Sequence, residues 1–107
     1  MPFTFHLGDT EAQAKRRIHE LSYDYKTHQK IFENGESRFE DLNFVFRLND
    51  YYQDTLFLDS DVTALKNELE TAISRIHDGH IVEELRRIWM VCETAERESS
   101  HIYVFRG

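Results

Sequence analysis

Proline and glycine, the residues that most often interrupt regular structure, are scarce in this chain of 107 residues. Proline occurs once, at Pro2, and glycine four times, at positions 8, 35, 79 and 107. The three internal glycines therefore mark the main breaks between elements. Linkers, internal repeats and low-complexity segments are also missing. The sequence therefore predicts a single domain over residues 1–107.

Cysteine and long apolar runs are scarce as well. Cys92 is the single cysteine, which excludes an internal disulfide framework and favours a reducing compartment. No apolar run approaches the roughly 18 residues that a membrane-spanning helix needs. The first residues lack the basic segment and apolar run of a secretory signal. We therefore expect a cytoplasmic protein that does not bind membranes.

Positive charge is missing from the centre of the chain. No lysine occurs between Lys30 and Lys66. Residues 33–61 carry −6 of the formal net charge of −7, from Arg38 and Arg47 against eight acids: Glu33, Glu36, Glu40, Asp41, Asp50, Asp54, Asp59 and Asp61. A fixed acidic surface attracts basic partners and repels nucleic acid. The charge pattern therefore predicts a basic protein partner and no direct contact with nucleic acid.

In the first third, alternation of apolar and polar residues predicts a strand over residues 3–7. A helix over residues 10–33 should follow, with a capping box formed by Thr10 and Gln13. Its apolar stripe includes Ala14, Ile18 and Leu21. Asn34 and Gly35 should end it, because both residues tolerate the left-handed conformation of a helix stop.

In the middle third, the alternation over residues 42–48 predicts a second strand that buries its Leu and Phe side chains. Residues 55–58 predict a third strand, and the short connection between the two favours an antiparallel hairpin. Val45 and Phe57 should face away from the core. A helix capped by Ser60 or Asp61 should then run to the break at residues 78–79.

The last third allows two interpretations. Apolar residues at 81, 85, 88 and 92 suit a third helix, but Ile88 to Cys92 are five consecutive apolar residues, which suit a buried strand. We favour a helical turn at residues 80–86, a strand around 88–92 and a closing strand over 101–105. The predicted fold is α+β, in the order β-α-β-β-α-β-β. It is a mostly antiparallel sheet with two helices packed on one face.

The tip of the predicted hairpin is the best candidate for a functional site. Tyrosine is frequent at interface hot spots, because it buries a large area with few rotatable bonds. Acids around it would steer a basic partner. The predicted protein-binding residues are Glu40, Asp41, Asp50, Tyr51, Tyr52, Asp54, Phe57, Asp59 and Asp61.

Other patterns that suggest chemistry have ordinary structural explanations. His77, His80, Glu83 and Glu84 include metal-ligand residue types, but no third ligand stands at a recognisable spacing. Cys92 lies in an apolar run, where cysteine usually acts as a small core residue. The basic cluster at positions 15–17 shares its predicted helix with acids, which favours a solvated helix face over a nucleic-acid site. No catalytic residue, metal or cofactor is therefore predicted.

Three functions remain as hypotheses. The first is an acidic binding protein that neutralises a basic target by occlusion, such as an immunity protein, an antitoxin, or a phage inhibitor of a nucleic-acid enzyme. The second is a small metal-dependent or acid–base enzyme that uses the cluster of His77, His80, Glu83 and Glu84. The third is an assembly subunit whose sheet edge pairs with a second copy as a homodimer. We favour the first, because it needs no catalytic motif.

Overall fold

The computed structural model describes residues 1–33 and 38–107, and says nothing of the Glu33 side chain. It contains a four-stranded antiparallel sheet in the order β2-β1-β4-β3. The elements in chain order are β1 (Phe3–Gly8), α1 (Glu11–Arg16), β2 (Leu21–Tyr23), α2 (Tyr25–His28), a π-helical turn η1 (Gln29–Glu33), α3 (Asn43–Phe46), β3 (Thr55–Phe57), α4 (Asp59–Arg75), α5 (Gly79–Glu98) and β4 (His101–Phe105). The predicted α+β class, with a mostly antiparallel sheet, is confirmed, and the predicted element order is roughly consistent with the observed one.

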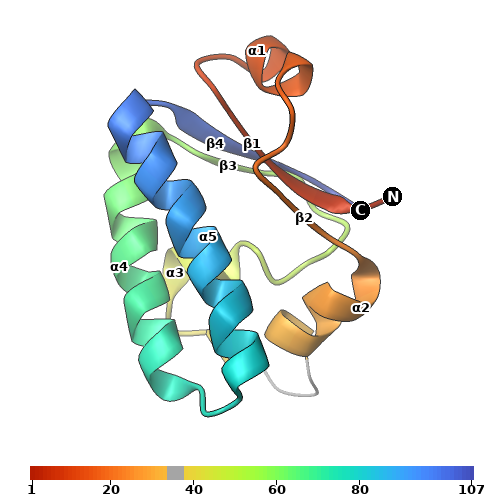
Figure 1. Ribbon diagram of the computed structural model, residues 1–107, viewed down its shortest axis with the longest axis vertical. Helices are drawn as coiled ribbons and strands as arrows, with labels where there is room; N and C mark the ends of the chain where they lie inside the picture. Colours follow the sequence, from red (N-terminus) through yellow and green to blue (C-terminus); the bar gives the residue numbers. More distant parts are fainter. Residues whose placement is uncertain (34–37) are drawn as a thin grey trace.

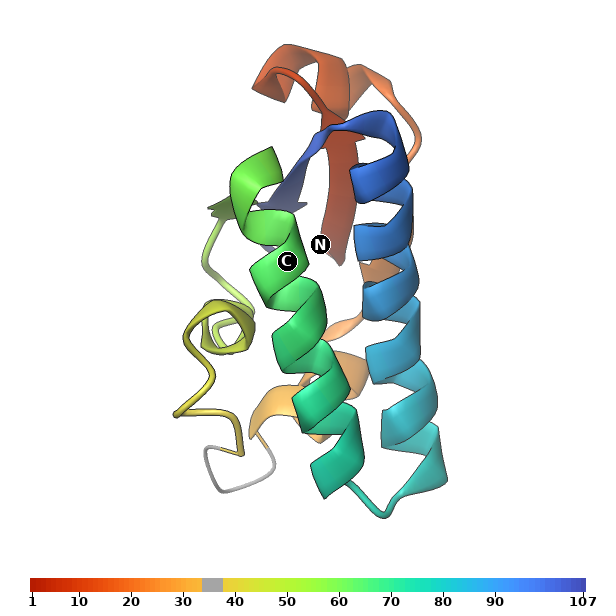
Figure 2. The same ribbon diagram turned by 90° about the vertical axis from the view of Figure 1, so that its left-hand side faces the viewer.

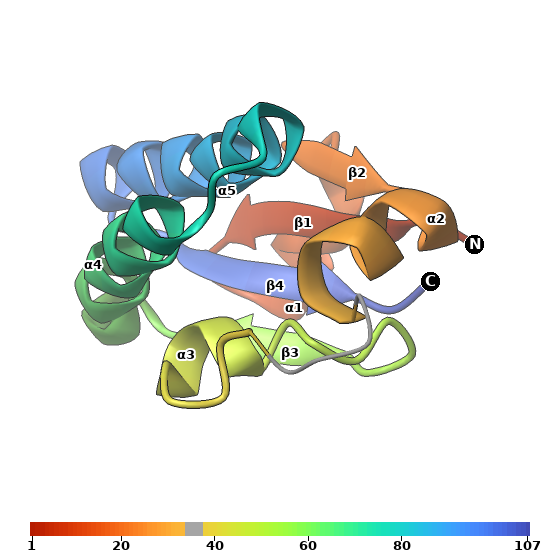
Figure 3. The ribbon, with the colours of Figure 1, turned by 90° about the horizontal axis from the view of Figure 1, so that it is seen from below.

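Helices lie on both faces of the sheet. The long helices α4 and α5 run side by side beneath it, as Figures 1 and 2 show. Seen from below, α2 and α3 lie on that same face, whereas α1 lies behind the sheet (Figure 3). We call the face covered by α2 to α5 the inner face, and the opposite one the outer face.

The core lies between the inner face and the long helices. Phe3, Phe5 and Leu7 of β1 are fully buried, and so is Phe57 of β3. The cross-strand register pairs Phe5 with Val104 of β4, which places both side chains on the inner face. The alternate residues of β1 and β4 therefore face outward, where α1 covers part of the sheet.

The strand predicted over residues 3–7 and the closing strand over 101–105 are confirmed. The helix predicted from residue 61 is confirmed as α4, although it begins at Asp59. Leu58, at its N-cap, makes no side-chain hydrogen bond there, so the cap predicted at Ser60 or Asp61 is wrong.

The helix predicted over residues 10–33 is interrupted. The predicted cap is present, since Thr10 Oγ1 accepts a hydrogen bond from Gln13 N at 3.2 Å. The helix α1 ends at Arg16, and residues 21–23 pair with β1 as β2 instead. Strand pairing overrides the helical pattern here, and Ile18, expected on the apolar stripe, is 84% exposed. The stop predicted at Asn34 and Gly35 lies outside the described residues.

The strand predicted over residues 42–48 is wrong, because residues 43–46 form α3. Leu42, Val45 and Leu48 are buried, a spacing of three rather than two. The physical reason is a carboxylate from α4: Glu68 Oε1 accepts hydrogen bonds from the N–H groups of Phe44 at 2.9 Å and Val45 at 3.1 Å. These N–H groups belong to the first turn of α3, where no intrahelical acceptor exists.

The last third is helical, so the strand favoured around residues 88–92 is wrong and the alternative helix is confirmed. Asp78 caps α5 by accepting a hydrogen bond from His80 N at 2.9 Å. The five apolar residues fit a helix because Ile88, Val91 and Cys92 are buried, while Met90 is 57% exposed. The half-buried Trp89 ring lies 4.8 Å from the ammonium nitrogen of Lys66 on α4.

Candidate functional site

Four of the predicted acids surround β3. Asp50 and Asp54 precede the strand, and Asp59 and Asp61 lie in the first turn of α4 just after it. No Lys or Arg occurs between Arg47 and Lys66. We call Asp50, Asp54, Asp59 and Asp61 the β3 acids.

Backbone N–H groups hold three of these carboxylates in place. Asp50 Oδ1 accepts from Tyr52 N at 2.9 Å, Asp54 Oδ1 from Arg106 N at 2.8 Å, and Asp59 Oδ1 from Ser60 N at 2.9 Å. In the described part of the chain, no Lys or Arg side chain forms an ion pair with a β3 acid. These charges are therefore fixed in position and not neutralised.

His101 contacts one of these acids. Its Nδ1 accepts a hydrogen bond from Asp59 N at 2.8 Å and lies 3.6 Å from Asp59 Oδ1. A ring nitrogen that accepts a hydrogen bond carries no proton, so in this arrangement the imidazole is neutral. It leaves the charge of Asp59 intact.

The other two predicted acids lie elsewhere. Asp41 accepts both guanidinium hydrogen bonds of Arg75, at 2.8 and 2.6 Å, and this pairing lowers the pKa of Asp41. Arg75 ends α4, whose 17 residues span about 25 Å from Asp59. Glu40 is exposed beside Asp41. The structure thus separates Glu40 and Asp41 from the β3 acids.

The two tyrosines differ in burial. Tyr52 is 62% exposed, as predicted for a binding residue, but Tyr51 is only 6% exposed. The Tyr51 ring stacks on Phe3 at 5.8 Å, and its hydroxyl donates to the carbonyl of Met1 at 2.5 Å. Tyr51 therefore belongs to the core, and its predicted place outside the core is wrong.

The predicted orientation of β3 is reversed. Phe57 is fully buried on the inner face, and so is Val45 in α3, although both were expected to face outward. Leu56 is the residue of β3 that faces outward, and it is 40% exposed. The sequence pattern located the strand but not its buried face, because Leu56, Phe57 and Leu58 are all apolar.

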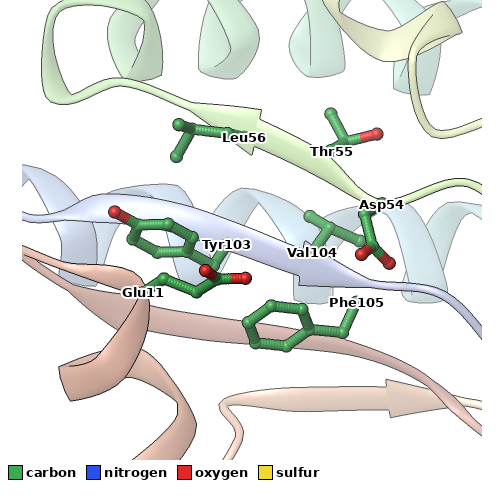
Figure 4. Close-up of a pocket in the computed structure, with 7 residues that line it drawn as sticks. All are labelled: Glu11, Asp54, Thr55, Leu56, Tyr103, Val104 and Phe105. Carbon is green, nitrogen blue, oxygen red and sulfur yellow. The ribbon is translucent and has the colours of Figure 1, made fainter.

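The outer face carries an open hollow next to β3, with a volume of about 270 Å³. Its lining is shown in Figure 4: Glu11 of α1, Asp54, Thr55 and Leu56, and Tyr103, Val104 and Phe105 of β4. The Tyr103 and Phe105 rings stack at 6.4 Å. The hollow thus combines aromatic surface with two carboxylates. We call it the outer hollow.

One cation of the protein already lies over an aromatic ring of the outer hollow. Lys15 Nζ lies 5.4 Å from the centre of the Phe105 ring and 3.6 Å from Glu11 Oε1. In the described chain no Lys or Arg lies over the Tyr103 ring. The side of the hollow next to Leu56 therefore keeps its ring and its Asp54 carboxylate available to another cation.

The sequence signal for this hollow was the alternation in residues 101–105, which puts Tyr103 and Phe105 opposite Ile102 and Val104. What could not be anticipated was α1, because its position above the sheet depends on tertiary contacts. His6 Nδ1 donates to the carbonyl of Ala14 at 2.9 Å. Gly8 allows the close approach, since a Cβ there would lie 2.8 Å from Ala14 N.

The residues suggested for metal or acid–base chemistry do not converge. Glu84 is buried on α5, whereas His77, His80 and Glu83 are exposed. Across residues 1–33 and 38–107, no three His, Cys, Asp or Glu side chains are placed to hold a metal ion. Burial raises the pKa of the Cys92 thiol to about 12, which keeps it protonated at neutral pH.

Two of the three basic residues at positions 15–17 form ion pairs. Arg17 donates to both carboxylate oxygens of Glu98, at 2.6 and 2.9 Å, and Lys15 pairs with Glu11. The Glu98 carboxylate in turn raises the pKa of Arg17. The cluster therefore connects α1 to α5 rather than presenting a continuous positive surface.

Comparison of the chain with protein-family models, curated proteins and solved structures gives no match in any of the three. None of the helices in the described residues is both long enough and apolar enough to span a membrane.

Proposed function

We propose that this protein binds a basic protein partner and neutralises it by occluding the partner's functional surface. The observation that carries the proposal is the group of four β3 acids beside exposed Leu56 and Tyr52. Three of them are held by backbone N–H groups, and none pairs with a described Lys or Arg side chain. Rigid carboxylates can occupy positions that phosphates take on a nucleic-acid enzyme. A nuclease toxin or another nucleic-acid enzyme is therefore the target class that suits this surface best.

Charge and apolar contact have separate roles in this proposal. Unscreened carboxylates raise the association rate with a basic surface, whereas exposed aromatic and aliphatic side chains slow dissociation. Occlusion requires no catalytic group, so the protein would act as an immunity protein, an antitoxin or a phage inhibitor. A cytoplasmic site of action fits a chain whose single cysteine is free and buried.

The test is affinity purification with three forms of the tagged protein. The first is wild type. The second carries Asp50→Asn, Asp54→Asn, Asp59→Asn and Asp61→Asn. The third is a matched control that removes four acids elsewhere: Asp9→Asn, Glu40→Gln, Glu70→Gln and Glu83→Gln. We expect wild type and control to retain the same basic protein and to inhibit its activity at one equivalent.

The variant without the β3 acids should associate with the purified partner roughly tenfold more slowly than the control. For wild type, the association rate should fall as salt rises, because the Debye length shrinks from about 10 Å at 0.1 M to about 3 Å at 1 M. A rate independent of salt, or an equal loss in both variants, would contradict the proposal. A bound partner that stays fully active would contradict neutralisation.

A further inference from the structure

We propose that the edge of β3 receives an extended basic segment of the partner as a fifth strand of the sheet. This inference rests on the proposed function, since it specifies which part of the same partner binds and how. The binding segment of the partner would be a β-strand with Arg or Lys on one face and apolar residues on the other.

The backbone of β3 is available for pairing. The strand lies at one end of the sheet order, with β4 on its only paired side. Within the described chain, no backbone group of Thr55, Leu56 or Phe57 has a hydrogen-bond partner outside β4. Figure 4 shows β3 at the margin of the sheet with no further strand beyond it. Unpaired edge groups of this kind are a template for an added strand.

The side chains around β3 specify a basic occupant on the outer face. Leu56 and its cross-strand partner Tyr103 supply apolar surface there. Asp54 and Asp59 flank the two ends of the strand. A long cationic side chain beside Leu56 can reach over Tyr103 into the outer hollow and pair with Asp54.

On the inner face, the surroundings of β3 favour apolar side chains in the added strand. Arg47 lies there, with its guanidinium carbon 4.7 Å from the Phe44 ring centre and 5.7 Å from that of Phe57. A cation on that face of the added strand would meet Arg47, whereas an apolar side chain would contact the half-buried Phe44 ring. The alternation of basic and apolar residues in the partner follows from this difference.

A second copy of the chain fits this edge poorly. Antiparallel pairing of two β3 strands centred on Leu56 would bring Asp54 of each copy near Asp59 of the other. Each copy also carries a net charge of −7. Like charges opposed across strands are unfavourable, so the charge pattern selects a basic partner over self-pairing.

The experiment uses the intact protein and a defined probe: a capped ten-residue peptide of alternating Arg and Val. We expect saturable NMR shift changes at residues 54–59 and 101–105. The outward-pointing amides of β3 should exchange with solvent roughly tenfold more slowly when the peptide is bound. A peptide with Glu in place of Arg should not bind, and neither should one with every backbone nitrogen methylated.

Matched variants place the interaction at one edge. Leu56→Lys puts a positive charge at the centre of β3 on the outer face, and Ser22→Lys does the same at the centre of the other edge strand. Leu56→Lys should weaken peptide binding roughly tenfold or more, and Ser22→Lys by less than about twofold. Equal effects would overturn the assignment to β3.

The remaining outcomes separate this inference from the proposed function. Shift changes without slower exchange would mean docking by charge alone, which overturns strand addition and leaves the partner's basic character standing. Absence of any peptide binding would also overturn strand addition. It would leave the proposed function standing if the wild-type protein still retains a basic partner. A dimer that sediments as two copies and is lost in Leu56→Lys would replace the basic strand by a second copy.

Discussion

The two edge strands of the sheet are both three residues long, yet they are closed off in different ways. β2 buries Leu21 and Tyr23, and the Tyr23 hydroxyl donates to the carbonyl of Glu84 on α5 at 2.8 Å. β3 buries Phe57 but leaves Leu56 outside. The two edges thus have equal length and equivalent positions in the sheet. β2 is tied to α5 by a buried hydrogen bond, whereas β3 is tied to the end of α3 only by an exposed one, from Thr55.

The charges around the two strands differ in the same sense. Residues 15–30, around β2, contain five Lys or Arg and two acids. Residues 48–61, around β3, contain four acids and no Lys or Arg. The surroundings of β2 therefore carry both signs with an excess of positive charge, whereas those of β3 carry negative charge alone. The two edges thus differ in charge distribution and not in strand length, and the proposed binding at β3 depends on that difference.

The largest expected effect concerns the loop that leads into β3. Tyr51→Ala should lower the free energy of unfolding by about 3–5 kcal/mol, because it empties a packed aromatic site. Tyr52→Ala should change it by no more than about 0.5 kcal/mol, because that ring is exposed. Urea unfolding of the two variants measures the difference. Similar losses in the two variants would contradict the difference in burial between Tyr51 and Tyr52.

The next effect concerns α3, whose C-terminal end contacts β3 through the hydrogen bond from Thr55 Oγ1 to the carbonyl of Arg47 at 3.2 Å. Glu68→Ala removes the acceptor of two N–H groups and should cost about 2 kcal/mol. Glu68→Gln keeps one acceptor oxygen and should cost about half as much. Glu70→Ala, on the same helix, serves as the control. Thermal unfolding measures the three variants. Equal melting temperatures for all three would contradict the capping role of Glu68.

An intermediate effect, at alkaline pH, tests the hydrogen bond from the Tyr23 hydroxyl of β2 to the Glu84 carbonyl of α5. Burial, and then the nearby Glu84 carboxylate, raise the pKa of Tyr23 above its ordinary value of 10.0. In the unfolded chain the hydroxyl loses its proton near pH 10, whereas the folded protein keeps it. The contribution of Tyr23 to the free energy of unfolding is therefore complete below pH 10, and above pH 10 it falls by about 1.4 kcal/mol per pH unit.

Tyr23→Phe should remove this part of the alkaline loss. Cys92 contributes a similar fall that begins near pH 9, its ordinary pKa being 9.0, so the comparison of wild type with Tyr23→Phe isolates the tyrosine. Urea midpoints between pH 9 and 11 provide the measurement. Parallel curves for the two proteins would show that the Tyr23 hydroxyl is not held by the folded state.

The smallest effect concerns the exposed centres of both edges. Leu56→Lys and Ser22→Lys should each change the free energy of unfolding by about 0.5 kcal/mol or less, since both side chains lie on the outer face. Urea unfolding at neutral pH checks both. A loss near 2 kcal/mol in Leu56→Lys alone would mean that Leu56 supports the fold, and the contrast between the edges would be weaker than the structure indicates.

Elements with a strong local pattern could be predicted from the sequence. The alternation of Phe3, Phe5 and Leu7 and the helical spacing of Val62, Leu65 and Leu69 each match what the folded chain buries. In these segments, local preference and tertiary packing agree. The fold class followed from them.

The segments that were predicted wrongly depend on partners far away in the chain. Residues 21–23 became a strand because β1 offered an edge, although the alternation of Leu21, Ser22 and Tyr23 was readable. Tyr51 entered the core because its contacts are Phe3 and the carbonyl of Met1. The β3 acids, by contrast, could be located directly, because they adjoin a strand that the pattern found correctly.

The hydrogen bonds from α3 to Glu68 also bear on the order of events during folding. The alternation in residues 42–48 favours a hairpin with residues 55–58 while the chain is still unfolded, because that pairing needs only nearby residues. The carboxylate that selects the helix lies on α4 and acts only once α4 has docked. We therefore expect α3 to form late, after α4 and the sheet. The final geometry beside β3 would then be set by the formation of α3, one of the last steps of folding.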